Sequence, residues 1–581
     1  MNHRQATTLW SQLLVEEFIR YGVDRFCVSP GSRSTPLTIA IARNPRAKFR
    51  MFPDERSAGF YALGYARATG MPAVLVCTSG TAVANYFPAV VEASADSRPL
   101  IVLSADRPFE LLEAGANQTI RQHDIFGGYT RWSFQLPAPE TGTPLASLLT
   151  TAAHAVRKSI GPSAGPVHLN APFREPLIPE NPDLDDPWVT PVRGWMESGQ
   201  PWTRFETPSK TPSPAGIASL RELLSTAANP LFVAGNLADE SDAEAVAALA
   251  RSLGVPLFAD LTSGARMSKH CEPWQLAFYS EEFTERYRPD TIVHFGGMLI
   301  GKQPAGAIRR WKPRHHVVVR EHPERFDQDH NVTLTIEASP SAVAPALEGC
   351  RKPGGTPQAG AFFAAAAERI DAAACAEEMP VNEISAARIV SSLLGEGQGL
   401  FVANSMPARD MDIYAAPCAD RPVFTALNRG VSGIDGITST AAGLSAGLGK
   451  PVLLLIGDIS FLHDLNALSL LDHEWNRVIV VVLNNGGGGI FSFLPVSGET
   501  DVFETCFATP QKIDIRAAAE TFGLGYVNPR TNREFSACIS GALQSGSSMI
   551  VEVSCSREGN VALHRQLKSA IAEATKLIEV V

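Results

Sequence analysis

The chain has 581 residues and a net charge of −10; 45% of its residues are hydrophobic and 19% are charged. This length is too great for one hydrophobic core and indicates roughly three or four domains of about 150 residues each. An acidic chain has no overall field that attracts nucleic acid or an anionic membrane, so we expect neither as a partner. Any anion that the protein binds must therefore be held by a local cluster of cations.

The cysteines and the N-terminus indicate a cytoplasmic location. The nine cysteines are scattered, with no CxxC pair and no Cys/His group at zinc spacing, as in a cytosolic protein with reduced thiols. The first residues, "MNHRQATTLW", lack the basic and then apolar pattern of a signal peptide, and no apolar run is long enough to cross a membrane. We therefore expect a soluble, cytoplasmic protein without a membrane span.

Residues 1–185 alternate helical and strand-like patterns. Trp10, Leu14 and Phe18 recur at helical spacing, and "RFCVS" follows as a strand before a helix through "TPLTIAIAR". Further strands are predicted at "AVLVCTSG", "PLIVLSA" and "GPVHLNAP". The Pro-rich stretch 186–214 is too rich in proline for a packed element and is predicted to be a linker on the surface.

Two further blocks repeat this alternation. Residues 215–350 contain the strand candidates "PLFVAG", "VPLFAD", "DTIVHFGG" and "HHVVVRE", and a second linker is predicted at 351–379. Residues 380–581 contain "GLFVAN", "PVFTAL", "PVLLLIGD", "RVIVVVLNN" and "MIVEVS", with a helix predicted over 464–475. The predicted fold class is α/β, with three tandem domains whose parallel sheets are flanked by helices. The strand orders stay open.

Polar residues follow two strands of the third domain. Asp458 ends "LLLIGD", and Asn485 ends "VVVLNN" just before four consecutive glycines. One helix separates these strands, so both residues should emerge side by side at the carboxyl edge of the sheet, where ligands bind. A carboxylate, an amide oxygen and a main-chain carbonyl suit Mg²⁺, and the glycines let N–H groups approach phosphates. The combination predicts a metal-bound diphosphate, although the Gly-Asp pair alone is usually a helix cap and the Asn-Asn-Gly run alone is usually a turn.

This combination resembles the cofactor site of thiamine diphosphate enzymes. The sequence departs from the family pattern at Ile459, where a second glycine commonly follows the aspartate. The resemblance implies that two side chains and one main-chain oxygen ligate Mg²⁺ or Mn²⁺. These implied metal ligands are Asp458, Asn485 and Gly487, and the implied cofactor contacts of this domain also include Gly488 and Ile490.

The resemblance also implies a catalytic acid from the first domain. "FRMFPDERSAGFYALGYARATG" provides a short strand, Glu55 at the turn, and then a helix. In the family, such a carboxyl group lies against the aminopyrimidine ring and drives its imino form, which removes a proton from the thiazolium. Taken alone, "DER" is also typical of a solvated helix start.

Two more positions are implied to touch the cofactor, and one consequence concerns assembly. Gln118 is placed to contact the amino group of the cofactor, and Ile434 stands where a bulky side chain supports its bent shape. Ile434 is equally compatible with an ordinary core position. Because the glutamate and the diphosphate site of this superfamily come from different subunits, the resemblance implies a homodimer or a homotetramer.

Seven motifs narrow the resemblance further. Together they are similar to the 2-succinyl-5-enolpyruvyl-6-hydroxy-3-cyclohexene-1-carboxylate synthase family of menaquinone biosynthesis. The likeness spans the first and third domains, and it covers the middle domain only through "GGMLIGK". The motifs are "SPGSRSTPL" (29–37), "LSADRP" (103–108), "GANQTIRQHDIFG" (115–127), "NSMPARDMD" (404–412), "NRGVSGIDG" (428–436), "GDISFLHDLNAL" (457–468) and "NNGGGGIFSFLP" (484–495).

The resemblance implies decarboxylation of 2-oxoglutarate and addition of the resulting four-carbon unit to isochorismate. Both substrates are dicarboxylates, and cations recur at glycine-rich or strand-end turns of this acidic chain, as a carboxylate site requires. Ile490, Phe491 and Leu494 would form an apolar wall, although Leu494 also suits a helix core. The implied substrate-binding residues are Ser32, Arg33, Arg107, Asn117, Gln118, Lys302, Ser405, Arg409, Arg429, Ile490, Phe491 and Leu494.

Two alternatives remain at this point. Another thiamine diphosphate decarboxylase or carboligase, such as an acetohydroxyacid synthase-like enzyme, would not need five cationic positions for pyruvate-sized substrates. Many such enzymes also bind a nucleotide in the middle domain, where this sequence has no G-x-G-x-x-G after a strand. A scaffold protein that had lost the chemistry is the other alternative, and the presence of Glu55, Asp458 and Asn485 argues against it.

Overall fold

The computed structural model divides the chain into two compact units. The first unit consists of Met1–Pro208, Gly430–Gly449 and Asn466–Leu470, and the second of Ser209–Arg429, Lys450–Leu465 and Leu471–Val581. The structure describes residues 1–206, 210–237, 240–351, 357–417, 423–471 and 477–579.

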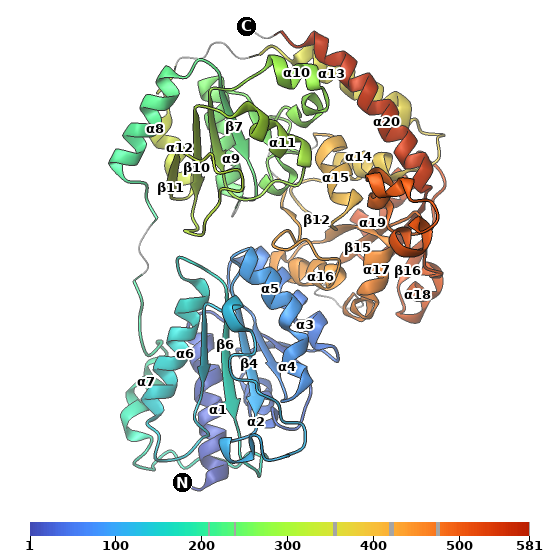
Figure 1. The fold of residues 1–581 in the computed structure, drawn as a ribbon. Coiled ribbons are helices and arrows are strands. Elements are labelled where there is room, and N and C mark those ends of the chain that lie inside the picture. The colour runs from blue at the N-terminus through green and yellow to red at the C-terminus, as the bar shows by residue number, and fades with distance from the viewer. Residues whose placement is uncertain (207–209, 238–239, 352–356, 418–422, 472–476, 580–581) are drawn as a thin grey trace. The chain divides into compact units, whose positions relative to one another are not determined.

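The first unit is built around a six-stranded sheet (Figure 1). Its strands are β1 (Arg25–Val28), β2 (Lys48–Met51), β3 (Val74–Cys77), β4 (Leu100–Asp106), β5 (Trp132–Gln135) and β6 (Pro166–Pro172). Their order is β2-β1-β3-β4-β6-β5, and every neighbouring pair is parallel. The residues of β3, β4 and β6 are buried throughout, as in apolar strands that are covered on both faces. The sequence predicts all of these strands except β5, whose residues are only partly buried.

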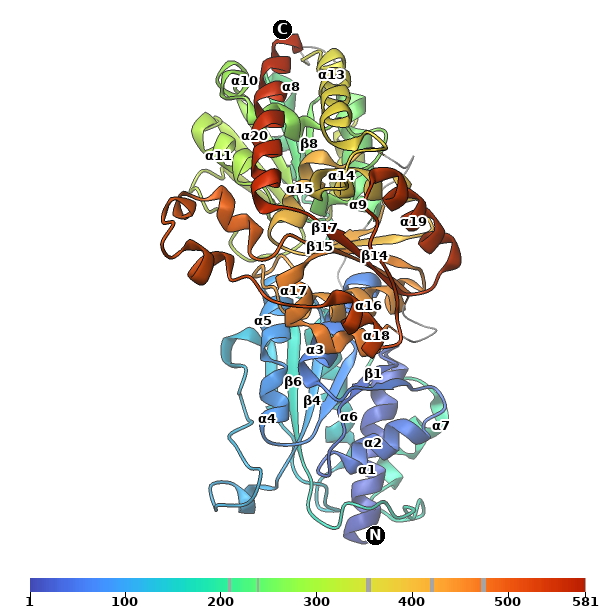
Figure 2. The same cartoon turned by 90° about the vertical axis from the view of Figure 1, so that its right-hand side faces the viewer.

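Helices cover both faces of the first sheet. They are α1 (His3–Arg20), α2 (Thr35–Arg43), α3 (Glu55–Thr69), α4 (Thr81–Asn85), α5 (Phe87–Ala95), α6 (Leu145–Ile160), α7 (Arg193–Ser198) and α16 (Ile437–Leu448). Helices α1, α2 and α6 pack on one face, and α3 and α5 on the other (Figure 2). Helix α16 packs closely along α3, because a Cβ at Gly64 would lie 2.0 Å from the carbonyl oxygen of Thr440, and one at Gly443 would lie 1.9 Å from that of Tyr61.

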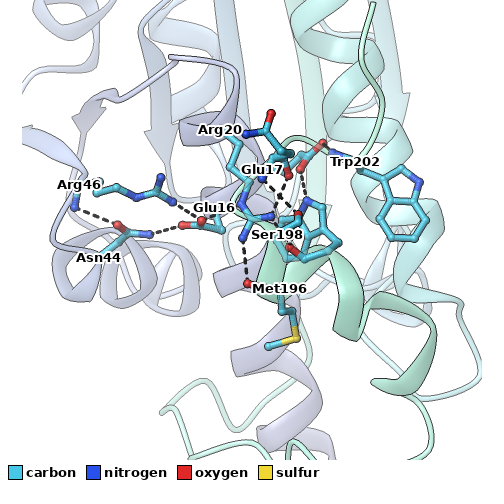
Figure 3. A network of polar contacts seen from close by, with 10 residues as sticks. Glu16, Glu17, Arg20, Asn44, Arg46, Met196, Ser198 and Trp202 are labelled. Carbon is cyan, nitrogen blue, oxygen red and sulfur yellow. Dashed lines mark hydrogen bonds and ion pairs between the residues drawn. The ribbon is translucent and has the colours of Figure 1, made fainter.

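The segment after the first sheet packs against α1, so the prediction of a surface linker is wrong for its first part. Trp195 is 6% exposed, and its Nε1 donates to Glu17 Oε2 at 2.8 Å. The main-chain N–H of Trp202 donates to Glu17 Oε1 at 2.8 Å (Figure 3). The guanidinium of Arg20 lies 3.8 Å from the Trp195 ring centroid. Proline does not exclude helices here because it stands in the first turn of a 3-10 helix, where its missing N–H costs nothing.

The second unit contains two more parallel sheets. The first of these has the order β11-β10-β9-β7-β8, and the sequence predicts four of its five strands but not β11. Its strands are β7 (Pro230–Ala234), β8 (Leu257–Ala259), β9 (Thr291–Phe295), β10 (His315–Arg320) and β11 (Leu334–Glu337). The associated helices are α8 (Pro214–Thr226), α9 (Glu240–Leu253), α10 (Glu281–Arg286), α11 (Lys302–Trp311), α12 (Pro340–Leu347) and α13 (Gly360–Ile370).

The third sheet has six parallel strands in the order β13-β12-β14-β15-β17-β16. These are β12 (Gly399–Val402), β13 (Thr425–Ala426), β14 (Val452–Gly457), β15 (Val478–Asn484), β16 (Gly525–Val527) and β17 (Met549–Ser554). Figure 2 shows β14, β15 and β17 side by side at its centre. The helices are α14 (Glu383–Leu393), α15 (Met406–Tyr414), α17 (Asp458–His463), α18 (Ile515–Thr521), α19 (Asn532–Ser545) and α20 (Arg557–Ala574).

One helix prediction and one linker prediction need correction. The helix predicted over 464–475 begins earlier, because α17 starts at Asp458 itself, whose charge suits a helix N-terminus. Residues 465–470 form a 3-10 helix, and residues 472–476 lie outside the described part. The linker predicted at 351–379 contains α13, whose alanine-rich sequence favours a helix and which packs against α20.

None of the helices in the described ranges combines the length and the apolar composition that crossing a membrane requires.

Candidate active site

Asp458 and Asn485 follow neighbouring strands of the third sheet. β14 pairs with β15 in parallel, with Gly457 opposite Leu483, and the two polar residues come directly after these strands. The main-chain N–H of Gly487 donates to Asp458 Oδ2 at 2.8 Å, which joins the two strand ends. The predicted side-by-side placement is therefore confirmed, whereas the role of these residues as metal ligands stays a prediction.

The glycine run is required by its backbone conformation and by close packing. Gly487 has a φ of +140°, and a Cβ there would lie 2.3 Å from the carbonyl oxygen of Ala508. The N–H of Gly488 donates to that same carbonyl at 2.7 Å. A Cβ at Gly489 would lie 2.6 Å from Asn485 Nδ2. Side chains at these positions would push the turn away from the strand ends.

The oxygen atoms at this edge fit a divalent cation. Asn485 Oδ1 is buried without a hydrogen-bond partner among the described residues, and an orphaned buried acceptor needs an explanation. Burial raises the pKa of the Asp458 carboxyl, and the main-chain N–H groups of Ile459, Gly487 and Gly486 oppose that rise. A carboxylate, an amide oxygen and a main-chain carbonyl together suit Mg²⁺ or Mn²⁺. The described ranges contain no group of three or more His, Cys, Asp or Glu side chains placed to hold a metal, but this oxygen set needs only one such side chain.

A cavity of about 400 Å³ opens in the second unit and gathers several of the predicted substrate residues. Lys302 and Arg409 line it, and Ile490 and Leu494 contribute apolar surface. Leu494 is half-buried and lies between two short 3-10 helices, so the alternative that it belongs to a helix core is wrong. Phe491 is absent from the cavity lining and instead contacts Phe507, with 5.8 Å between ring centroids.

Three cations of the cavity lining have no partner among the described residues. In the part of the chain that the structure describes, the side chains of Lys302, Arg565 and Lys568 form no hydrogen bond or ion pair. Asp412 also lines the cavity, but burial and the nearby Asp260 carboxylate raise its pKa to about 8, so it carries little charge at neutral pH. The cavity therefore offers an unneutralised positive field to an anion.

Two further predicted residues, Ser405 and Arg429, lie close to Arg409 of the cavity lining. Arg409 Nη1 donates to the carbonyl oxygen of Ser405 at 2.6 Å, and Arg429 Nη1 donates to Asn404 Oδ1 at 3.1 Å. Burial lowers the pKa of Arg409, and the positive charge of Arg429 lowers it further. Ser405 has a φ of +73°, which is unusual for a residue other than glycine and is typical of functional sites.

The first unit has its own cluster at the carboxyl edge of its sheet. The guanidinium of Arg107 donates to Ser79 Oγ and, at 3.1 Å, to the carbonyl oxygen of Gln118. Gln118 Nε2 donates to the carbonyl oxygen of Ser79 at 2.8 Å. Arg33 is buried and donates to the Phe173 carbonyl at 2.8 Å. The structure thus brings Arg33, Arg107 and Gln118 to one edge. Burial lowers the pKa of the Arg107 guanidinium, and the positive charge of Arg33 lowers it further, as expected of two neighbouring cations.

Glu55 is the first residue of α3, as predicted. Its helix is capped by Asp54, whose Oδ1 accepts from the N–H groups of Arg56 at 2.9 Å and Ser57 at 3.3 Å. Glu55 is half-buried, and its charge adds to the effect of burial in raising the pKa values of Cys77 and Tyr86. The glutamate therefore lies near the end of β3, at the carboxyl edge of the first sheet.

Four predicted residues of the first unit are exposed, and Gln118, whose hydrogen bonds are given above, is one of them. Ser32 and Asn117 are exposed in this unit, and no side-chain hydrogen bond of theirs to another described residue fixes their role. Ile434 is 37% exposed, so the alternative that it is an ordinary core residue is wrong. Its implied role in supporting the cofactor stays a prediction.

The sequence interpretation missed a group of buried acids and the α20 side of the cavity. Burial, together with the carboxylates of Asp410 and Asp458, raises the pKa of Glu383 to about 8. His564 Nε2 lies 2.9 Å from Asp410 Oδ1, and Arg565 and Lys568 follow His564 on the same helix. The spacing "HRQLK" places the histidine and the lysine on one helix face, but such a pattern is usually a solvated surface.

Comparisons with known proteins define the class of the protein. The family described as "Thiamine pyrophosphate enzyme, N-terminal TPP binding domain" matches residues 10–125, "Middle domain of thiamine pyrophosphate" matches 186–402, and "Thiamine pyrophosphate enzyme, C-terminal TPP binding domain" matches 419–553. A crystal structure of benzoylformate decarboxylase from Polynucleobacter necessarius superposes with a TM-score of 0.70 and 17% identity, covering 94% of this chain and 98% of that one. The fold is that of the thiamine diphosphate enzymes.

Closer relatives identify the family. Over 571 residues the chain is 66% identical to the 2-succinyl-5-enolpyruvyl-6-hydroxy-3-cyclohexene-1-carboxylate synthase of Chlorobaculum tepidum and 64% identical to that of Chlorobaculum parvum, with 98% of each chain covered. The synthase of Prosthecochloris aestuarii is 50% identical over 579 residues, with 99% of each chain covered. This chain belongs to the 2-succinyl-5-enolpyruvyl-6-hydroxy-3-cyclohexene-1-carboxylate synthase family of thiamine diphosphate-dependent enzymes, so the predicted resemblance is confirmed.

Proposed function

We propose that this chain decarboxylates 2-oxoglutarate and adds the resulting four-carbon unit to isochorismate. The products are CO₂ and 2-succinyl-5-enolpyruvyl-6-hydroxy-3-cyclohexene-1-carboxylate, an intermediate of menaquinone biosynthesis. The observation that carries this proposal is the cavity of the second unit, whose Lys302, Arg565 and Lys568 have no protein partner in the described ranges. Two dicarboxylate substrates would supply the missing negative charge.

The third sheet would hold the charged tail of the cofactor through a metal ion. Asp458 and Asn485 would contribute side-chain oxygens and Gly487 its carbonyl oxygen to Mg²⁺ or Mn²⁺. The glycine turn would lie against the diphosphate, as the lack of side chains there permits. The N–H groups of Gly487, Gly488 and Gly489 already donate to Asp458 Oδ2, the Ala508 carbonyl and the Gly487 carbonyl, so they hold the turn in place. Asn485 Oδ1 supports this assignment, because it is buried and lacks a hydrogen-bond partner within the described ranges.

Glu55 would act as the catalytic acid. A carboxyl group at the start of α3 can hold a proton at the pyrimidine ring nitrogen and thereby set the protonation state of the neighbouring amino group. Gln118 would contact that amino group. When bound, thiamine diphosphate supplies the nucleophilic carbon that attacks the keto group and accepts the electron pair left by CO₂.

The cationic residues would bind and orient the substrates. Arg409 and Lys302 line the cavity, and their charges would hold carboxylates while stabilising negative charge that develops on oxygen. Arg33 and Arg107 would contribute from the first unit, where protein carbonyls and hydroxyls already fix their guanidinium groups. The apolar side chains of Ile490 and Leu494 would exclude water from the reacting carbon.

We also propose that the working unit is a cytoplasmic homodimer or a tetramer built from such dimers. The proposal rests on the superfamily pattern, in which the glutamate and the diphosphate site belong to different subunits. Glu55 of one subunit would then serve a cofactor whose metal is held by Asp458 and Asn485 of another.

The reaction can be tested by incubating the protein with thiamine diphosphate, Mg²⁺ and 2-oxoglutarate, with and without isochorismate. We expect CO₂ release that rises when isochorismate is present and matches isochorismate consumption mole for mole. Pyruvate in place of 2-oxoglutarate serves as the control and should react poorly, because it lacks the distal carboxylate. Preferred turnover of pyruvate, or CO₂ release that is independent of isochorismate, would instead indicate another decarboxylase or carboligase.

A further inference from the structure

One buried acid touches the proposed metal site without having a role in the reaction above. Glu383 is the first residue of α14 and is 1% exposed. Its Oε1 accepts a hydrogen bond from Asn485 Nδ2 at 2.8 Å. Its Oε2 has no hydrogen-bond partner in the described part of the chain. The contact joins a side chain from α14 to the end of β15, 102 positions apart in the sequence.

The contact matters because an asparagine side chain has two different ends. Only Oδ1 can bind a cation, whereas the NH₂ group can only donate, and rotation about the last side-chain bond exchanges the two. A carboxyl oxygen that accepts from Nδ2 favours the orientation in which Oδ1 points away from it. Asn485 Oδ1 is buried and has no hydrogen-bond partner among the residues that the structure describes, which leaves it available to a cation.

The other proposed side-chain ligand, Asp458, can bind a metal ion in either orientation of its carboxylate. Asp458 has two equivalent oxygens, and main-chain N–H groups hold both: Ile459 N donates to Oδ1 and Gly487 N to Oδ2, each at 2.8 Å. Rotation of a carboxylate exchanges one oxygen for another. Asn485 is therefore the one proposed side-chain ligand whose orientation decides whether it can bind metal.

We infer that Glu383 is a positioning residue that orients the Asn485 amide so that its oxygen, and not its NH₂ group, faces the metal ion. The inference rests on the proposed function, since it takes Asn485 to be a metal ligand. Residues that orient metal ligands typically change metal affinity by about 10- to 100-fold when they are replaced. Glu383 acts on the amide by geometry, so an oxygen acceptor at this position is what the site requires.

The experiment measures the apparent Mg²⁺ dissociation constant of the full chain at saturating thiamine diphosphate, by calorimetry or by the quenching of tryptophan fluorescence. Glu383→Met keeps the length of the side chain and removes the acceptor, and we expect Mg²⁺ to bind about 10- to 100-fold more weakly. Glu383→Gln removes the charge but keeps an acceptor oxygen, so its loss should be clearly smaller. Equal losses in both variants, or none in Glu383→Met, would overturn the inference.

A second pair of variants tests orientation itself. Asn485→Asp provides oxygen at both ends of the side chain, so the further replacement Glu383→Met should cost little Mg²⁺ affinity in that background. An undiminished penalty would contradict the positioning role. Cys555→Ala is the matched control, because Cys555 Sγ donates to the same Glu383 Oε1 at 3.8 Å, and we expect unchanged Mg²⁺ affinity.

Folding and the proposed function are checked separately. The unfolding midpoint without metal shows whether each variant folds, and Glu383→Ala takes the place of Glu383→Met in the same titration if the latter does not. A wild-type protein whose binding of thiamine diphosphate did not depend on Mg²⁺ would end the proposed function. Normal wild-type binding with unaffected Glu383 variants would end only the positioning role.

Discussion

The two clusters of cations differ in how the protein holds them. In the first unit, Arg33 and Arg107 already donate to protein groups, including the Phe173 carbonyl and Ser79 Oγ. In the second unit, Lys302 and Lys568 line a cavity and form no hydrogen bond or ion pair within the described ranges. The first arrangement fixes the direction of a charge before a ligand arrives, and the second leaves charge available for a ligand to neutralise.

This difference separates structural from functional roles. Replacing a cation that holds main-chain carbonyls leaves buried acceptors unsatisfied and lowers stability as well as activity. Replacing a cation without protein partners removes only what it does for the ligand. The acid Glu55, in turn, should affect neither stability nor substrate charge but only the movement of a proton.

The largest effect is expected for Glu55→Gln. Glutamine keeps the size of the side chain and loses the exchangeable proton, so kcat should fall by about 10²- to 10⁴-fold. Binding of thiamine diphosphate, followed by tryptophan fluorescence, should change little. A variant that retains wild-type kcat would remove the first unit from the chemistry, and one that loses cofactor binding would give Glu55 a structural role.

The next largest effects are expected for Lys302→Gln and Arg33→Gln, which should differ in stability but not in activity. Each should lower kcat/KM by about 10- to 100-fold, which corresponds to one charge-assisted contact. The unfolding midpoint should stay unchanged for Lys302→Gln, which has no partner to lose among the described residues. It should fall for Arg33→Gln, because the Phe173 carbonyl and the Glu175 carboxylate each lose a donor. Equal changes in stability would erase the distinction between the two clusters.

A smaller effect concerns the pH dependence of stability. Burial and Asp260 raise the pKa of Asp412 from 3.8 to about 8, so the folded state holds a proton that the unfolded state has released. The stabilisation of the folded state by the neutral Asp412 carboxyl is fully present below pH 4. It is lost as the pH rises towards 8, where the carboxyl loses its proton. Between these values the wild-type unfolding midpoint should therefore decline relative to that of Asp412→Asn, which mimics the neutral acid. Parallel pH profiles would mean that Asp412 is charged in the folded protein.

The smallest effect is expected for Lys568, an exposed residue of the cavity lining. Lys568→Gln should raise the KM of a dicarboxylate substrate by about two- to threefold at low salt, and the difference should vanish at high ionic strength. Lys576→Gln is the matched control, because Lys576 is also exposed and does not line the cavity. An equal change in both variants would indicate a general effect of net charge.

Much of the fold could be predicted from local patterns. The strands β3, β4, β14 and β15 are buried on both faces. Strands of this kind can be recognised in the sequence as short, continuous apolar runs. The edge strand β5 and the short strand β16 are only partly buried, so their sequences carry no clear apolar run. The Pro-rich segment around Trp195 was also beyond prediction, because its packing depends on the distant Glu17.

The site also contains some residues that could be predicted from the sequence and others that could not. Asp458 and Asn485 could be predicted to lie together because parallel strands order their ends along one edge. The contact of Glu383 with Asn485 could not be predicted, because the two residues are 102 positions apart. A glutamate at the start of a helix is also usually exposed to solvent. The α20 side of the cavity was missed for the same reason, since only the packed structure places Arg565 and Lys568 beside Lys302.

The most direct measurement asks whether Glu55 and Asp458 of different chains serve one cofactor. Glu55→Gln and Asp458→Ala proteins, each inactive alone, are mixed in equal amounts under conditions that exchange subunits. Half of the dimers would then be mixed, each with one intact site of two, so about a quarter of wild-type activity should return. As a control, wild type mixed with the Glu55→Gln/Asp458→Ala double variant should retain about a quarter of wild-type activity, not half. No recovery in the first mixture and half activity in the second would contradict a site shared between two chains.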